Sequence, residues 1–221
     1  RIRWCDTIDP TNWSTGNSGK SDRFDQEDAL MCALPLGPSL IVYRERGIIR
    51  MDFLGTAAKL FSFEPLITDE GVFSPNGVVD LGDYHILFGG SNIYEYQGGR
   101  SLRSIGDAIF SQVFGQAGDL SPLMKHRAFA VYIRDIDEVL FFYPTTSGGG
   151  NPDIVLRYNI AQKAFVFRSF ANRFMGFGFF VSTSSKTWLE LTGSWLSQTW
   201  TWNSIVLSAN IANLLLCDET N

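Results

Sequence analysis

The segment at residues 16–21, Gly-Asn-Ser-Gly-Lys-Ser, is the strongest candidate for phosphate chemistry. A phosphate loop needs a glycine, four residues and then Gly-Lys-Ser or Gly-Lys-Thr, so that backbone amides surround the phosphates and the lysine meets their charge. Only the second half of that pattern is present, because Ser14 stands in the place of the leading glycine. A polar segment precedes it where a buried strand is required, and an acidic run follows it. We therefore predict a solvated loop here and no nucleotide site.

Carboxylates and histidines are the next candidates, because both side chains bind metal ions. Calcium needs six to eight oxygen ligands. The acidic run lacks the Asp-x-Asp-x-Asp-Gly spacing of a calcium loop and consists of Asp22, Asp25, Glu27 and Asp28. The two histidines, His85 and His126, are 41 positions apart and do not form a local metal-binding pair. We predict no metal site, and a packed or hydrogen-bonded side chain for His85.

Covalent and glycosidic chemistry find no support in the spacing either. The three cysteines, Cys5, Cys32 and Cys217, are odd in number, far apart and without a Cys-x-x-Cys pair, which indicates buried thiols in a reducing compartment. A glycosidase needs two positioned carboxylates, and no pattern in the sequence pairs them. No residue is therefore predicted to be catalytic or to bind a cofactor.

The charge and length of the chain limit its function further. The formal net charge is −5 and the pI is near 5.0, which is not the basic footprint of a protein that grips nucleic acid. No stretch reaches the roughly 18 apolar residues of a membrane-spanning helix. A chain of 221 residues is long enough for one large all-β domain.

Three strand-turn-strand units recur along the chain, at residues 40–53, 84–96 and 138–158. In each, an apolar run of β-forming residues meets a short turn and returns as a second strand, as in a β-hairpin. The equivalent positions Val42, Leu87 and Leu140 are 45 and 53 residues apart, about the length of one four-stranded propeller blade. We predict an all-β, β-propeller-type fold of several four-stranded antiparallel blades. The approximate repeats are residues 1–55, 56–104, 120–170 and 171–221.

Helical signal is confined to residues 105–113, where Ile105, Ile109 and Val113 recur at a spacing of four. Aromatic residues are abundant, with 18 Phe and 6 Trp, and they favour packing of one blade against the next. The functional alternative is an exposed stacking platform for bases or sugars. Its residues would be Trp195, Trp200 and Trp202.

The N-terminal segment carries a resemblance to known proteins. Residues 7–13 partly resemble the Asp-box of sialidase-like propellers, which is a structural hairpin. Residues 1–13 as a whole resemble the (Ile/Val)-x-Trp-Ser-Asp-x-x-Asp-Pro-x-x-Trp opening of large virion proteins of tailed bacteriophages, with Cys5 in place of the serine. The hairpins at residues 40–55 and 87–98 and the Tyr-Asn strand at residues 156–165, with Phe165 in place of a tryptophan, resemble later motifs of the same proteins.

This resemblance implies a structural function. The family includes the nozzle, or lower tail tube, protein of short-tailed phages, whose propeller domains surround the channel through which the genome leaves. It implies a virion protein without enzymatic activity or cofactor, whose partners are copies of itself in a ring, other tail proteins on the adaptor or portal side, tail fibres, and double-stranded DNA that passes without specific binding. Two alternatives remain open, a carbohydrate-binding or glycan-depolymerising propeller and a phage head-completion or DNA-stabilisation protein.

Two further expectations concern the ends of the chain and the N-terminal motif. The sequence starts at Arg1 inside a predicted strand and ends at Asn221 just after another, which indicates a segment of a longer polypeptide. In the assembled ring, Trp4 and Trp13 are expected to be largely buried and to hold the Asp-Pro loop against its blade.

Overall fold

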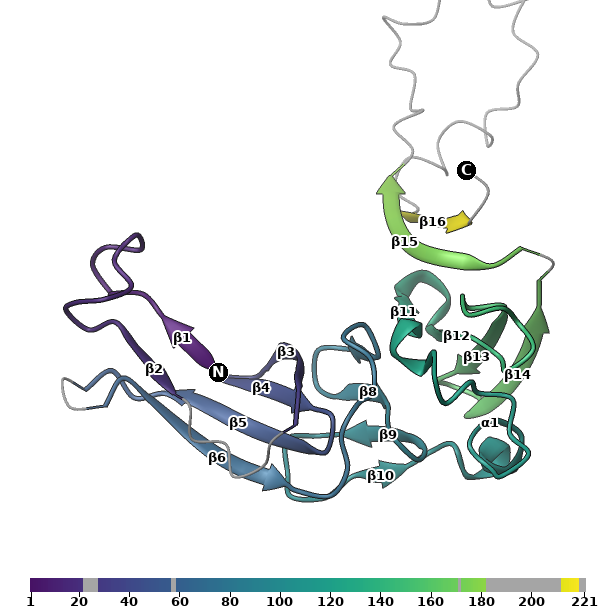
Figure 1. Ribbon diagram of the computed structural model, residues 1–221, viewed down its shortest axis with the longest axis horizontal. Coiled ribbons are helices and arrows are strands. Elements are labelled where there is room, and N and C mark those ends of the chain that lie inside the picture. Colours follow the sequence, from purple (N-terminus) through teal and green to yellow (C-terminus); the bar gives the residue numbers. More distant parts are fainter. Residues whose placement is uncertain (22–27, 57–58, 171, 182–211, 219–221) are drawn as a thin grey trace, which may run out of the picture.

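The computed structural model describes residues 1–21, 28–56, 59–170, 172–181 and 212–218, and this part of the chain is all-β (Figure 1). It contains sixteen strands, three short 3-10 turns and one α-helix of four residues. The predicted all-β class with four-stranded antiparallel sheets is therefore confirmed.

Three sheets each contain four antiparallel strands in chain order, so that every strand pairs with its neighbours in the sequence. The first sheet consists of β3 (Leu30–Leu36), β4 (Ser39–Arg44), β5 (Gly47–Phe53) and β6 (Phe61–Ile67). The second consists of β7 (Val78–Asp80), β8 (His85–Phe88), β9 (Ile93–Tyr96) and β10 (Arg103–Ser104). The third consists of β11 (Phe129–Ile133), β12 (Glu138–Tyr143), β13 (Ile154–Asn159) and β14 (Ala164–Ser169). The three predicted hairpins are the middle strand pairs of these sheets.

The expected boundary between residues 55 and 56 is wrong. It falls inside the first sheet, because β6 pairs with β5 from Phe53↔Phe61 to Ile48↔Ile67. The loop between the strands is closed by the amide of Leu54, which donates to the carbonyl of Leu60 at 2.8 Å. The second and third sheets lie within the expected ranges 56–104 and 120–170. Within residues 171–221, the described strands β15 (Phe174–Val181) and β16 (Ala212–Asp218) form a two-stranded antiparallel sheet.

The sheets stack face to face, and this explains why their middle strands are continuously apolar instead of alternating. In β8, Leu87 packs with the first sheet, whereas Ile86 and Phe88 pack with the third. In β12, Phe141 points into the core shared with the second sheet and Phe142 into the core shared with β15 and β16. Each inner sheet therefore buries both of its faces.

The first strands of the sheets mark one edge of the stack. Asn76, just before β7, forms a parallel bridge with Phe129 in β11, and the amide of Ala130 donates to the carbonyl of Asn76 at 2.8 Å. The Ser74 hydroxyl donates to the carbonyl of Ala128. Strand β7 also contacts β3. The described residues form an open arc instead of a closed ring (Figure 1).

Helical structure lies where the sequence predicts it, with two small additions. The 3-10 turn η1 (Asp107–Ile109) leads into α1 (Phe110–Val113), and Ile109 and Val113 are buried. Two further 3-10 turns, η2 (Lys125–Arg127) and η3 (Arg134–Ile136), flank β11. No helix in the described part of the chain is long and apolar enough to cross a membrane.

The N-terminal strands β1 (Ile2–Trp4) and β2 (Gly19–Ser21) form a separate antiparallel pair. Trp4 packs edge-on against Phe61 at 5.2 Å between ring centroids, and its ring lies so close to Gly19 that a Cβ there would be 2.5 Å from it. Trp4 is therefore half-buried. Trp13 is 48% exposed in the single chain, and its burial in an assembled ring stays a prediction. In the single chain, hydrogen bonds of its own polar side chains hold the loop.

Candidate functional site

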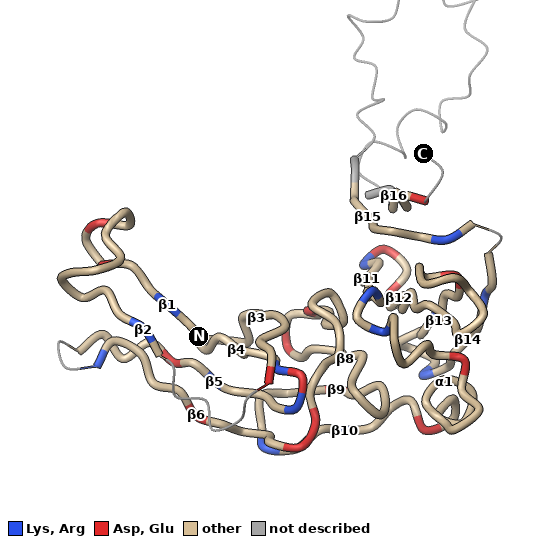
Figure 2. The backbone as a smooth tube through the Cα atoms, viewed as in Figure 1, with Lys and Arg blue, Asp and Glu red and all other residues tan. Residues whose placement is uncertain are grey.

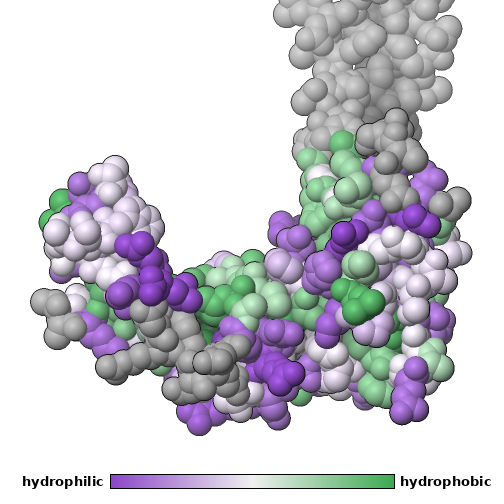
Figure 3. Space-filling model, viewed as in Figure 1, coloured by the Kyte–Doolittle hydropathy of each residue, from purple (hydrophilic) through white to green (hydrophobic). Residues whose placement is uncertain are grey.

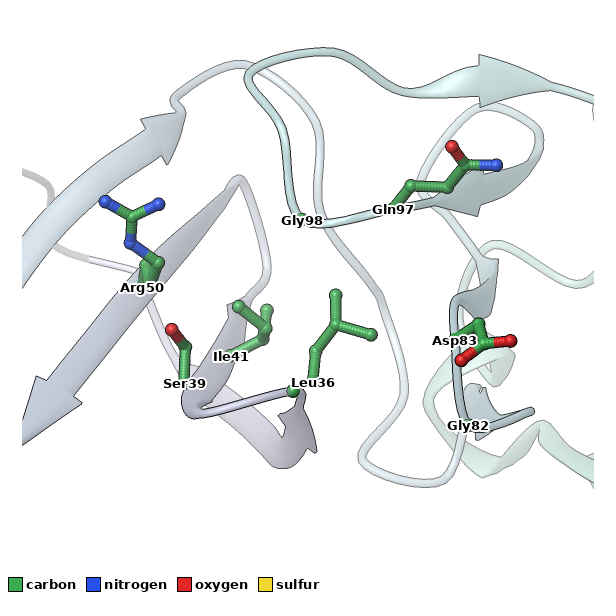
Figure 4. Close-up of a pocket in the computed structure, with 9 residues that line it drawn as sticks. Leu36, Ser39, Ile41, Arg50, Gly82, Asp83, Gln97 and Gly98 are labelled. Atoms are coloured by element: carbon green, nitrogen blue, oxygen red, sulfur yellow. The ribbon is translucent and has the colours of Figure 1, made fainter.

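A cavity of about 320 Å³ lies between the first and second sheets and is the first candidate site (Figure 4). Leu36 and Ile41 lie between Arg50 on one side and Asp83 and Gln97 on the other. The turns that bound the cavity contain glycines, including Gly98, which adopts a positive φ of 85°. The cavity thus combines an apolar floor with a few polar side chains.

The polar side of this cavity is an ion-pair network. Arg50 Nε donates to Asp52 Oδ2 at 3.0 Å, and Arg50 Nη2 donates to Glu64 Oε2 at 2.5 Å. Glu64 also accepts from Arg100, and this hydrogen bond, together with the charge of Arg50, lowers the pKa of the Glu64 carboxyl. The Ser39 hydroxyl donates to Asp52 Oδ1 at 2.5 Å. These contacts favour the charged form of Glu64.

The ion pairs of this network connect strands and do not form an acid-base pair. General acid or base chemistry needs a group whose pKa lies near the working pH, and the ion pairs move Glu64 away from that range. The nine residues that line the cavity include no histidine and no cysteine. The arrangement joins strands β5 and β6 to the segment after β9, and we assign it no catalytic role. Sequence reasoning missed it, although the alternation of Arg50 and Asp52 in an otherwise apolar strand was a visible signal.

His85 lies between the first two sheets, fully buried, and the prediction of a hydrogen-bonded side chain is confirmed. Its Nδ1 is 2.7 Å from the Tyr43 hydroxyl, and its Nε2 is 3.0 Å from the carbonyl of Pro35. Because a carbonyl only accepts, Nε2 carries the proton and Nδ1 accepts from Tyr43. Burial lowers the pKa of His85, opposed by the Pro35 carbonyl and by Asp80 at 3.6 Å. The neutral ring therefore joins β3, β4 and β8.

A second cavity, of about 500 Å³, lies at the end of the sheets where β4 turns into β5 and β8 turns into β9. Glu70 contributes to its wall and accepts from the backbone amide and the hydroxyl of Ser91, at 3.2 and 2.7 Å. Lys125 stands over the ring of Phe73 at 5.6 Å on the other side. Charges of both signs share this wall, and Glu70 holds the turn at Ser91 in place.

A third cavity, of about 730 Å³, is the largest of the three and lies between β11 and β15. Phe174 and Phe177 supply aromatic surface, and His126 and Arg127 stand exposed at its rim. Arg127 Nη1 donates to Asn151 Oδ1 at 2.8 Å. This cavity has the most apolar lining of the three.

The segment at residues 16–21 does not form a phosphate loop. Residues Gly19–Ser21 are the strand β2, and Lys20 is opposite Arg3 in the ladder. Asp9, in the partial Asp-box, accepts from the amide and hydroxyl of Thr11 at 2.9 and 2.7 Å. Both motifs therefore build one loop and its supporting strands.

The other sequence candidates are dispersed. Of the acidic run, residues 22–27 lie outside the described residues, and Asp28 pairs with Arg44. No group of three or more potential metal ligands occurs in the described part of the chain. Cys5, Cys32 and Cys217 are free thiols, and burial raises the pKa of Cys32 to about 12. Cys217 is exposed, so the expectation of buried thiols is wrong for this residue. The three tryptophans of the possible stacking platform, Trp195, Trp200 and Trp202, lie outside the described residues.

Comparisons with known proteins do not assign the chain to a family. No protein-family model matches it, and no curated protein matches it. Its function is therefore inferred from the architecture described above and from the motif resemblance.

Proposed function

We propose that this chain is a structural component of a phage tail, a wall element of the nozzle or tail tube through which the genome is ejected, and that it has no enzymatic activity. The observation that carries the proposal is the stacking of consecutive four-stranded sheets through continuous apolar cores. It agrees with the propeller domains of the virion proteins that residues 1–13 resemble. Polar groups in the cavities hold turns and strands in place, which suits a wall.

Dense aromatic contacts between the sheets make the stack rigid. Phe88 of the second sheet lies within 6.0 Å of four aromatic rings. Two of them belong to the third sheet, one to the segment before β7 and one to the residue after α1. Close-packed interiors transmit strain instead of deforming. A stack of this kind is suited to keeping a channel open while DNA passes.

The charge of the chain is compatible with a conduit. Acidic and basic residues are interspersed over the three sheets (Figure 2), and the net charge is −5. Phosphate binding depends on clusters of lysine and arginine. A wall with a negative balance would let DNA slide without holding it.

The experiment that tests this proposal is the location of the protein in particles. An antibody against the chain should label one end of intact virions in electron micrographs, at the tail, and mass spectrometry should find the chain in purified particles. Labelling at the neck instead of the tail tip would favour a head-completion protein. Absence from purified particles would refute a virion function.

A further inference from the structure

One loop of the N-terminal pair is built to present an apolar tip. Residues 6–17, which we call the tip loop, connect β1 to β2 and protrude from the stack of sheets (Figure 1). Asp6 Oδ1 accepts from the amides of Thr7 and Asn17 at 2.8 and 3.1 Å. Asn12 Oδ1 accepts from two further amides of the loop, and Asp9 from Thr11. These bonds fix the backbone, yet Ile8 is 88% exposed.

The 730 Å³ cavity offers a complementary surface. Of its lining residues, Met175 is 64% exposed and Phe177 is 39% exposed, so apolar area is open to solvent there. Hydrophobic residues gather on the surface around β15 and β16 (Figure 3). The cavity lining contains His126 and Arg127 and no aspartate or glutamate.

The charges of the two surfaces are opposite. The tip loop contains Asp6 and Asp9 and no lysine or arginine. The rim of the cavity carries the exposed guanidinium of Arg127. Opposite charges on two surfaces guide their encounter and fix their orientation.

The two surfaces cannot meet within one chain, because the tip loop and β15 lie at opposite ends of the arc (Figure 1). We propose that the tip loop of one copy docks into the 730 Å³ cavity of a second copy, with Ile8 against Met175 and Phe177. The contact is heterologous, so repetition closes a ring or continues as a filament. This inference rests on the proposed function, because a tail wall is an assembly of copies. It adds the two surfaces by which one copy contacts the next.

The expected strength follows from the size of the contact. A single loop buries less surface than the roughly 1,200–2,000 Å² of a standard interface, so self-association by this contact alone is weak. Burial of one isoleucine side chain changes an association constant by at least about tenfold. Variants at either surface should therefore have measurable effects.

Sedimentation velocity of the full chain over a range of concentrations tests the proposal. Wild type should associate with increasing concentration, and Ile8→Ser and Met175→Glu should each weaken association at least tenfold. Ile136→Ser is the matched control, because Ile136 is also an exposed isoleucine, at 53%, in a different part of the molecule. It should associate like wild type. Far-UV circular dichroism should show the same strand spectrum for all four proteins.

A mixture of the two variants distinguishes this arrangement from others. Ile8→Ser retains an intact cavity and Met175→Glu retains an intact tip loop, so an equimolar mixture should form one-to-one dimers and nothing larger. A monomeric wild type at all concentrations, association of either variant like wild type, or a mixture without dimers would each overturn the proposal. None of these results bears on whether the chain is found in virions, so the two proposals fail separately.

Photocrosslinking keeps the inference testable if a variant fails to fold. A benzophenone amino acid at position 8 of otherwise wild-type protein should crosslink between copies to peptides that contain residues 174–177. Crosslinks between copies only to other segments would contradict the docking site.

Discussion

Truncation of Phe88 to alanine is the sharpest test of how the sheets are held together. Phe88 is fully buried, and its ring centroid lies 4.9 Å from Phe73, 5.6 Å from Phe114, 5.3 Å from Phe141 and 6.0 Å from Tyr143. Phenylalanine-to-alanine changes in a core cost about 3–5 kcal/mol. Four aromatic neighbours, each worth about 0.5–1.5 kcal/mol beyond area, place Phe88→Ala toward the upper end of that range.

Urea unfolding followed by far-UV circular dichroism measures this loss. With a slope of about 2 kcal/mol per molar urea, a loss of about 4 kcal/mol lowers the midpoint by about 2 M. The control is Phe110→Ala, because Phe110 is 45% exposed and contacts only Phe114 among the ring pairs of the described residues. It should cost less than about 1 kcal/mol.

A double-mutant cycle with Phe141→Ala isolates the contact between the second and third sheets. The coupling energy should be about 0.5–1.5 kcal/mol. Additive losses, or a Phe88→Ala variant no less stable than Phe110→Ala, would refute the packing of β8 against the third sheet.

Three further predictions concern charged groups. Burial lowers the pKa of His85 in the folded chain, so the unfolded chain binds a proton at this residue more readily. The free energy of unfolding should therefore be constant above about pH 7 and fall as the pH drops below about 6.5. The control variant His126→Asn should keep this pH dependence, and His85→Asn should lose it. Arg157→Met removes the cation that pairs with the Glu138 carboxylate, a residue that is 2% exposed. The free energy of unfolding, measured in urea, should fall by about 1–3 kcal/mol. Adding Glu138→Gln should restore part of this loss. Calorimetric titration with Mg-ATP should show no binding, and saturable micromolar binding that Lys20→Ala abolishes would contradict the structural role of β2.

The sequence predicts the middle strands of each sheet well. Residues of β4, β8 and β12 form short apolar runs next to turn residues, and such runs signal strands that are covered on both faces. The helical segment is predicted from a different local signal, the spacing of four between Ile105, Ile109 and Val113. The expected boundary after residue 55 divides the first sheet, because the turn glycine Gly55 fits a boundary between blades as well as a turn within one blade.

The candidate sites could not be predicted to the same extent, because they depend on how sheets meet. The contact between His85 and Tyr43 joins residues 42 positions apart on different sheets. The network around Arg50 depends on strand register, which sets Arg50 opposite Glu64. The exposure of Ile8 and Trp13 depends on a loop held by its own side chains, which a motif does not reveal.

Electron cryomicroscopy of the protein assembled in purified particles tests the central claim most directly. We expect copies of the chain to form a ring around a channel, with the three sheets of each copy stacked in chain order and β3, β7 and β11 at their shared edge. An assembly without a channel, or copies in which these sheets lie apart from one another, would contradict the claim.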